Sequence, residues 1–104
     1  MKIIYGDILK SKAEVIVNPS DTHLKHKGGL SLKIVKSGGK IIQKESNKIG
    51  YCPIGKAVIT SAGFLPFLFI IHVPTVDWKT KRRASYVDIY KGAISALKLQ
   101  KKKE

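Results

Sequence analysis

The sequence contains one cysteine, few acidic residues and no long uninterrupted apolar segment. Cys52 has no partner for an internal disulfide and cannot by itself complete a cysteine-based zinc site, so packing has to stabilise the fold. The longest apolar stretch, residues 64–76, is interrupted by two prolines and a histidine and is shorter than the roughly 20 residues of a transmembrane helix. An acid at position 7 interrupts the apolar segment that a signal peptide requires, so we expect a cytoplasmic protein with no membrane partner.

Lys and Arg outnumber Asp and Glu by 20 to 7, which leaves a formal net charge of +13 at pH 7. A field of this sign attracts polyanions, so nucleic acids and nucleotides are candidate partners. The same excess is also typical of a solvated lysine coat in proteins from hot habitats, so charge alone does not select a function. The 104 residues, 43% of them apolar and 26% charged, are typical of a single globular domain.

Short apolar runs bounded by turn residues predict strands over residues 2–5, 14–18, 56–60 and 67–73. The last of these runs is apolar throughout, which is typical of a strand that is covered on both faces. Helices are predicted between residues 28 and 39, over 40–47, and from the capping signal of Ser85 and Asp88 onward. This order of strands and helices indicates a layered α/β domain with a mixed sheet.

Familiar cofactor and metal motifs are missing from the sequence. The chain has no G-x-G-x-x-G after a predicted strand, no P-loop, no H-E-x-x-H and no C-x-x-C, so we expect no cofactor and no metal site. Cys52 has no base near it in the sequence, and His72 lies within a predicted apolar strand. We therefore interpret the thiol as structural and the imidazole as a hydrogen-bonded core residue.

Polar residues follow the first two predicted strands, at the edge where open α/β sheets bind ligands. Asp7 follows the first strand, Asn18 and Asp21 follow the second, and the pair Gly28-Gly29 leads into a helix whose free N–H groups can hold an anion. A carboxylate can accept a hydrogen bond from the exocyclic amine of adenine, and glycines let the backbone approach a pyrophosphate closely. These residues fit a nucleotide, although each is also a common turn or cap residue.

The same residues belong to a series of short motifs that follow one another along the chain. They are Gly6-Asp7-Ile8, Ala13 to Asp21, Gly28-Gly29-Leu30, Gly50 to Ala57, Thr60 to Pro66, and Ile70 to Val73 with Trp78. In this order the motifs resemble those of the macro domains, a family that binds ADP-ribose and its derivatives. The resemblance extends from Ile3 to Leu99 and implies a three-layer α/β/α fold with a mixed sheet.

The resemblance also implies which residues bind the ligand. Asp7 and the backbone of Ile8 would recognise the adenine. Gly28 and Gly29, with Leu30 in the same loop, would face the pyrophosphate and the distal ribose. The expected partner is therefore ADP-ribose or a related adenine nucleotide.

Two positions of the expected site depart from the family pattern. Asp21 stands where the family has a second Asn that contacts the distal ribose, and it is the one candidate for a catalytic residue. An ionised Asp cannot donate the hydrogen bond of an amide, and it adds negative charge near a pyrophosphate. Lys27 stands where the family loop has its first Gly, so its cation can attract phosphates while its side chain can block their close approach. Asn18 matches the family and would support the end of its strand.

The chain ends just after the last predicted helix, at Glu104, where the family continues with two further strands and a second glycine-rich loop. We therefore expect residues 1–104 to form one shortened macro domain with a basic segment over residues 100–104. In the family those two strands lie between the first strand and the second. The sheet should then close differently or take strands from another copy, because each lost backbone hydrogen bond costs about 1–3 kcal/mol.

The leading prediction is a binding protein for ADP-ribose whose hydrolase activity is weak or lost, because hydrolytic members position water with the second Asn and both loops. An ADP-ribosyl hydrolase or O-acetyl-ADP-ribose deacetylase that a partner chain completes is the enzymatic alternative. A second interpretation is a module for RNA or poly(ADP-ribose), and a third is a vestigial protein. The module would bind through Lys79, Lys81, Arg82, Arg83 and the lysines of residues 101–103.

Overall fold

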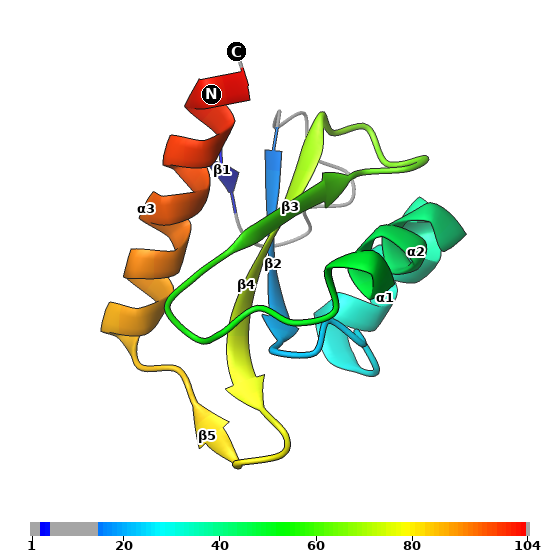
Figure 1. Ribbon diagram of the computed structural model, residues 1–104. Helices are drawn as coiled ribbons and strands as arrows, with labels where there is room; N and C mark the ends of the chain where they lie inside the picture. The colour runs from blue at the N-terminus through cyan, green and yellow to red at the C-terminus, as the bar shows by residue number, and fades with distance from the viewer. Residues whose placement is uncertain (1–2, 5–14, 104) are drawn as a thin grey trace.

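The computed structural model describes residues 3–4 and 15–103. Two helices cover one face of a central sheet and a third helix covers the other, as Figure 1 shows, so the predicted three-layer α/β/α arrangement is confirmed. The elements are β1 (Ile3–Ile4), β2 (Val15–Asp21), α1 (Gly29–Gly38), α2 (Lys40–Ile49), β3 (Val58–Ser61), β4 (Phe69–Asp77), β5 (Arg82–Arg83) and α3 (Tyr86–Lys103). None of the described helices is long and apolar enough to cross a membrane.

The sheet is mixed, with the order β1-β2-β4-β3, and β5 pairs with the C-terminal end of β4. The pairs β1–β2 and β2–β4 are parallel, whereas β3 and β5 both run antiparallel to β4. β1 pairs directly with β2, so no other strand lies between these two strands. This is the rearranged sheet that the sequence predicted as the alternative to taking strands from another copy. Association with another copy stays a prediction.

The side chains of the central strands alternate between two hydrophobic clusters, one on each face of the sheet. Ile16 and Ile70 pack with Ile34 of α1 and Ile42 of α2. On the opposite face, valines 15, 17 and 73 pack with Ile71 and with the half-buried Ile89 of α3. Both faces of β4 are thus covered, which explains its continuous apolar sequence.

The turn predicted after residue 18 is wrong, because β2 continues through Pro19 to Asp21. Among the described residues, β1 pairs only with Val15 and Ile16, whereas Pro19 opposes Val73 of β4. Between Ser20 and Asp21 the register shifts: Ser20 opposes Pro74 and Asp21 opposes Val76. Thr75 is therefore an extra, unopposed residue that forms a β-bulge in β4.

The predicted helix boundaries are close to those observed. Gly39, at φ +96°, separates α1 from α2, and its N–H bonds the Val35 carbonyl. The capping signal of α3 is confirmed, since the Asp88 N–H donates to Ser85 Oγ over 3.1 Å and the Ser85 N–H donates to Asp88 Oδ2 over 3.0 Å. Residues 100–103, expected as a basic segment, belong to the last turns of α3.

Candidate functional site

A cavity of about 590 Å³ opens at the carboxyl ends of β2 and β4, beside the N-terminus of α1. Strand ends and a helix N-terminus meet here, as in the ligand sites of other open α/β sheets. Its walls are formed by Pro19, Ser20, Asp21, His26, Lys27, Gly28, Gly29, Ser31, Thr75, Val76 and Trp78. A hollow of similar size, about 570 Å³, lies along α1 and α2 between lysines 36, 40 and 44, and it includes none of the residues that the sequence predicted.

The N-terminus of α1 forms one wall of the cavity and carries no side-chain cap. Gly28 is the N-cap residue, and the first turn contains no acid, so the leading N–H groups of the helix are available to an anion. Gly29 has φ +60°, which favours glycine, and a Cβ at either glycine would meet nothing within 4 Å. The exposed Lys27 adds a cation to the same wall.

Asp21 braces the loop between β2 and α1. Its Oδ1 accepts the N–H groups of Lys25 at 2.9 Å and His26 at 3.1 Å, and its Oδ2 accepts the N–H of His23 at 3.0 Å. The loop needs this support, because Leu24 and His26 have φ of 55° and 52° without being glycines. With 6% of its surface exposed, Asp21 lines the cavity with a carboxylate that is already hydrogen-bonded.

Asn18 lies beneath the cavity, fully buried. Its Nδ2 donates to Ser31 Oγ over 3.1 Å and to His72 Nδ1 over 2.9 Å, so it ties β2 to α1 and to β4. Because Nδ1 of His72 accepts, its Nε2 carries the proton and donates to Thr60 Oγ1 over 2.8 Å. Among the described residues, the Asn18 Oδ1 is a buried side-chain oxygen without a hydrogen-bond partner. Asn18 thus links the end of β2 to its neighbours, and His72 is a hydrogen-bonded core residue, as the sequence predicted for this histidine.

His26 extends this buried polar chain to the second helix. Its Nδ1 lies 2.7 Å from Ser31 Oγ and its Nε2 lies 3.0 Å from Ser46 Oγ, while its ring centroid is 4.9 Å from that of His72. Burial lowers the pKa of His26, and the charge of Asp21 partly opposes this shift. Burial, together with the neighbouring His26, lowers the pKa of His72 to about 3. Both imidazoles are therefore neutral at pH 7.

Cys52 is buried, and its N–H donates to the carbonyl of Thr22, the residue that follows the end of β2, over 2.7 Å. Burial raises the pKa of its thiol to about 11. The thiolate required for nucleophilic attack is therefore scarce at pH 7, in agreement with the interpretation as a structural residue.

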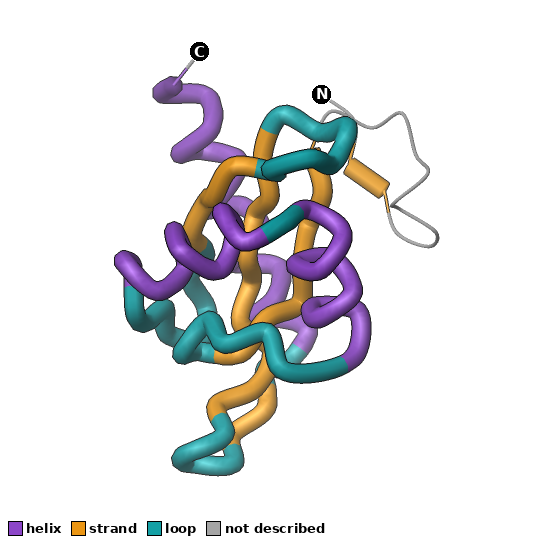
Figure 2. Tube along the Cα trace, turned by 90° about the vertical axis from the view of Figure 1, so that its right-hand side faces the viewer, coloured by secondary structure: helices purple, strands orange, loops and turns teal. Residues whose placement is uncertain are grey.

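Trp78 forms the outer rim of the cavity and leads into the hairpin between β4 and β5. Asp77 shapes the turn, because its Oδ1 accepts the N–H groups of Lys79 at 2.9 Å and Thr80 at 3.2 Å. These bonds, chiefly that from Thr80, hold the pKa of Asp77 below its ordinary value. In the views of Figures 1 and 2 the hairpin projects beyond the end of β2.

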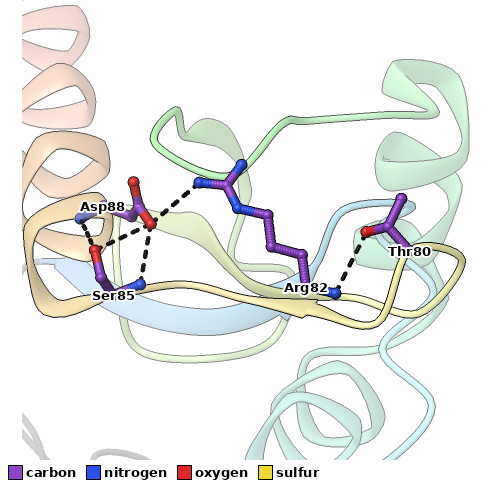
Figure 3. Close-up of polar contacts among 4 residues, drawn as sticks. All are labelled: Thr80, Arg82, Ser85 and Asp88. Carbon is purple, nitrogen blue, oxygen red and sulfur yellow. Dashed lines mark hydrogen bonds and ion pairs between the residues drawn. The ribbon is translucent and has the colours of Figure 1, made fainter.

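Arg82 fastens the hairpin to the start of α3. Its guanidinium lies 3.4 Å from Asp88 Oδ2, and its backbone N–H donates to Thr80 Oγ1 over 3.3 Å (Figure 3). The predicted basic loop is therefore a short ordered hairpin in which one of the four basic side chains is already paired. The other three, Lys79, Lys81 and Arg83, are exposed and form no ion pair within the described part of the chain.

The structure brings together Asp21, Lys27, Gly28 and Gly29, four of the residues that the sequence proposed for ligand binding. Leu30 does not line the cavity and is 37% exposed, whereas Asn18 lies beneath it. Asp7 and Ile8 fall outside the described residues, so their role in adenine binding remains a prediction. Seven other wall residues were not proposed as ligand-binding residues from the sequence: Pro19, Ser20, His26, Ser31, Thr75, Val76 and Trp78. Helical spacing could have placed Ser31 in the first turn of α1, next to the glycines.

Comparison with known proteins agrees with this geometry. Residues 17–104 match the family described as Macro domain. The chain belongs to the macro domain family. A macro domain-containing protein of Listeria monocytogenes is 42% identical over 81 residues, which are 74% of this chain and 46% of that protein. An uncharacterized protein of Thermotoga maritima is 38% identical over 101 residues, which cover 93% of this chain and 17% of that protein.

Solved macro domains have the same fold. An Oceanobacillus iheyensis macrodomain variant with ADPR superposes with a TM-score of 0.78 at 29% identity, covering 97% of this chain and 58% of that one. The macro domain of ganglioside induced differentiation associated protein 2 superposes with a TM-score of 0.76 at 25% identity, covering 97% and 51%. The chain thus spans about half the length of these macro domains.

Proposed function

We propose that this macro domain binds ADP-ribose, or a closely related adenine nucleotide, in the cavity at the ends of β2 and β4. The uncapped N-terminus of α1, with Gly28 and Gly29 in the cavity wall, carries this proposal. Free N–H groups, the positive end of the helix dipole and the adjacent Lys27 together suit a pyrophosphate. The volume of about 590 Å³ is within the range of small-molecule sites.

Related macro domains support this choice of ligand. The Oceanobacillus iheyensis macrodomain, which shares the fold at 28–30% identity, has been solved with ADPR and with ADP. The ligand diphosphate would lie against α1, and the adenine would extend toward the predicted Asp7 and Ile8. Trp78 would stand at the other end of the cavity, beyond the distal ribose.

We further propose that the protein binds ADP-ribose but that its hydrolase activity is weak or lost. The Asp21 carboxylate accepts three backbone N–H groups, which occupy three of its roughly four acceptor positions and leave at most one to orient a water against the ribose. Asp21 then acts as a positioning residue for the loop that carries Lys27. Release of ADP-ribose from a modified substrate at ten times the uncatalysed rate, lost on Asp21→Ala in a protein that still folds, would contradict this assignment.

Calorimetric titration with ADP-ribose tests the binding proposal, with two substitutions of Gly28 as a matched pair. Gly28→Asp places a carboxylate where it can cap the free N–H groups of α1 and repel a diphosphate, so binding should weaken at least tenfold. Gly28→Ala adds a methyl group to open space and should retain most of the affinity. Equal affinity of the wild type and Gly28→Asp would show that the ligand does not bind at α1.

A further inference from the structure

We propose that the hollow along α1 and α2 is a docking site for an acidic polypeptide segment of a partner protein, one that carries an apolar anchor side chain between its carboxylates. The hollow is separate from the nucleotide cavity, because the two share no wall residue. The proposal therefore goes beyond the proposed function and does not depend on it.

The charge of the two helices is the first observation. α1 and α2, which face the viewer in Figure 2, carry five lysines and a single acid, Glu45. Glu45 is already engaged, because its Oε2 accepts the N–H of Ser61 over 3.0 Å and the hydroxyl of Ser61 over 2.7 Å. Within residues 3–4 and 15–103, no ion pair involves a lysine of either helix. These lysines are therefore available to the carboxylates of a partner.

The lining of the hollow is the second observation. Its volume is about 570 Å³, and Lys36, Lys40 and Lys44 stand around Val35 and Gly39. The three lysines are exposed, whereas Val35 and Gly39 are half-buried, so the apolar atoms of these two residues lie deeper than the charged groups. A concave surface with apolar atoms at its base and cations at its rim suits an apolar side chain that is flanked by acids.

Phe64 borders the hollow and is the third observation, because its side chain is 89% exposed. Its ring lies beside Gly39: a Cβ built on this glycine would be 3.0 Å from two carbons of the ring. Ile41, which is 43% exposed, reaches the same loop, since a Cβ built on Gly63 would be 3.1 Å from the Ile41 Cγ2. Large apolar side chains that are exposed next to a concave surface are typical of interaction sites.

Together these observations favour an acidic segment over other occupants. A second copy of this chain has the same net charge of +13 and would bring lysines against lysines. A nucleic-acid strand could place phosphates on the lysines, but Val35 gives a base no flat face for stacking, and Phe64 stands only at the edge. An acidic segment uses both features: its anchor fills the hollow beside Phe64, and its carboxylates pair with the lysines of the rim.

Fluorescence anisotropy with short labelled peptides tests the proposal. The anchor peptides consist of Glu and Asp around a central Leu-Phe, Phe-Leu or Trp-Leu pair, and the matched peptide has Ser-Ser at its centre. The hollow variant replaces Lys36, Lys40 and Lys44 by Gln. The control variant makes the same change at Lys79, Lys81 and Arg83, which are exposed on the hairpin. Phe64→Ser removes the exposed ring, and oligoadenylate RNA is titrated in parallel.

We expect an anchor peptide to bind at least about tenfold more tightly than the Ser-Ser peptide, because exposed ion pairs alone contribute little. The hollow variant should bind it about tenfold more weakly, and the control variant should stay within about twofold of the wild type. Phe64→Ser should weaken anchor-peptide binding about fivefold and leave binding of the Ser-Ser peptide nearly unchanged. Amide chemical shifts that the peptide alters should cluster on α1, on α2 and around Phe64.

Four outcomes would overturn the inference. Anchor peptides that bind no more tightly than the Ser-Ser peptide would show that the hollow accepts no apolar anchor. Equal losses in the two charge variants would show nonspecific attraction to the net charge. RNA that binds more tightly than every anchor peptide, and loses affinity only in the hollow variant, would identify nucleic acid as the occupant. Shift changes confined to the walls of the nucleotide cavity would place the peptide there instead.

The same proteins also keep this inference distinct from the proposed function. Titration with ADP-ribose tests the cavity, and neither the hollow variant nor Phe64→Ser alters a residue of its walls. If ADP-ribose fails to bind while an anchor peptide behaves as expected, the proposed function fails and the docking site stands. If ADP-ribose binds and the anchor peptides give any of the four contrary outcomes, only the docking site is refuted.

Discussion

Asn18 and His72 lie opposite each other on β2 and β4, and the Asn18 amide donates to His72 Nδ1 over 2.9 Å. This bond connects the two central strands through side chains as well as backbone, directly beneath the cavity. It also requires a neutral His72, because a protonated ring would present a second donor to the amide. The polar chain from Thr60 to Ser46 therefore depends on the protonation state of its histidines.

The first prediction is that stability falls in mild acid. His72 has a pKa of about 3 in the folded protein, and burial also lowers the pKa of His26, while each would titrate near 6.5 when unfolded. Below pH 6.5 the unfolded state thus binds more protons, and the free energy of unfolding decreases as pH falls toward the folded pKa values. The slope should approach about 1.4 kcal/mol per pH unit for each linked proton.

Urea unfolding between pH 7.5 and pH 4.5 measures this slope. A free energy of unfolding that is constant over this range would show that the two buried histidines are not linked to folding.

The second prediction concerns Asp21 as the brace of the loop. Asp21→Ala leaves three N–H groups without their acceptor and should destabilise the fold by about 2–3 kcal/mol. Asp21→Asn keeps one acceptor oxygen for Lys25 and His26 but turns an NH2 group toward the His23 N–H, so an intermediate loss is expected. Chemical denaturation gives both values. A loss below about 0.5 kcal/mol for Asp21→Ala would contradict the structural role.

The third prediction separates stability from binding at Gly28. A carboxylate at this N-cap should increase the free energy of unfolding by about 0.5 kcal/mol, because it bonds N–H groups that are free in the native helix and interacts with the helix dipole. The same Gly28→Asp change should weaken nucleotide binding at least tenfold. Thermal unfolding without ligand provides the first value. A destabilised variant would mean that loss of binding reflects damage to the helix.

The fourth prediction is that Cys52 reacts slowly with thiol reagents. Its thiol is buried and has a pKa of about 11, so little thiolate is present at pH 7.5. Reaction with a chromogenic disulfide should be at least tenfold slower in buffer than in denaturant, where the unfolded chain exposes the thiol. Equal rates in the two solutions would show that the Cys52 region opens readily.

Much of the fold could be predicted from the sequence, because its signals are local. The apolar run of β4, the glycines around α1 and the pairing of Ser85 with Asp88 each act over a few residues. The end of β2 could not be predicted, since Pro19 cannot donate a ladder hydrogen bond and normally stops a strand, whereas here the pairing with β4 continues through Pro19 to Asp21. That property depends on which strands become neighbours.

The glycine-rich backbone of the candidate site could be predicted from the sequence, but the contacts of its polar side chains could not. Gly28 and Gly29 signal an anion site through their own conformational freedom, whatever surrounds them. The roles of Asp21 and His26 depend instead on contacts that form only in the folded chain, such as the bond from His26 to Ser46, which is 20 positions away. Arg82 likewise counts as a free cation in the sequence but is paired with Asp88 in the fold.

The bulge at Thr75 controls which side chain faces the mouth of the cavity. Side chains alternate along β4, so the one unopposed residue sets the orientation of everything that follows it. Deleting Thr75 would move Trp78 into the place that Asp77 now occupies, and the indole would leave the entrance. Insertions or deletions of a single residue at this point could therefore change the ligand preference of a macro domain by reorienting the side chains that follow the bulge.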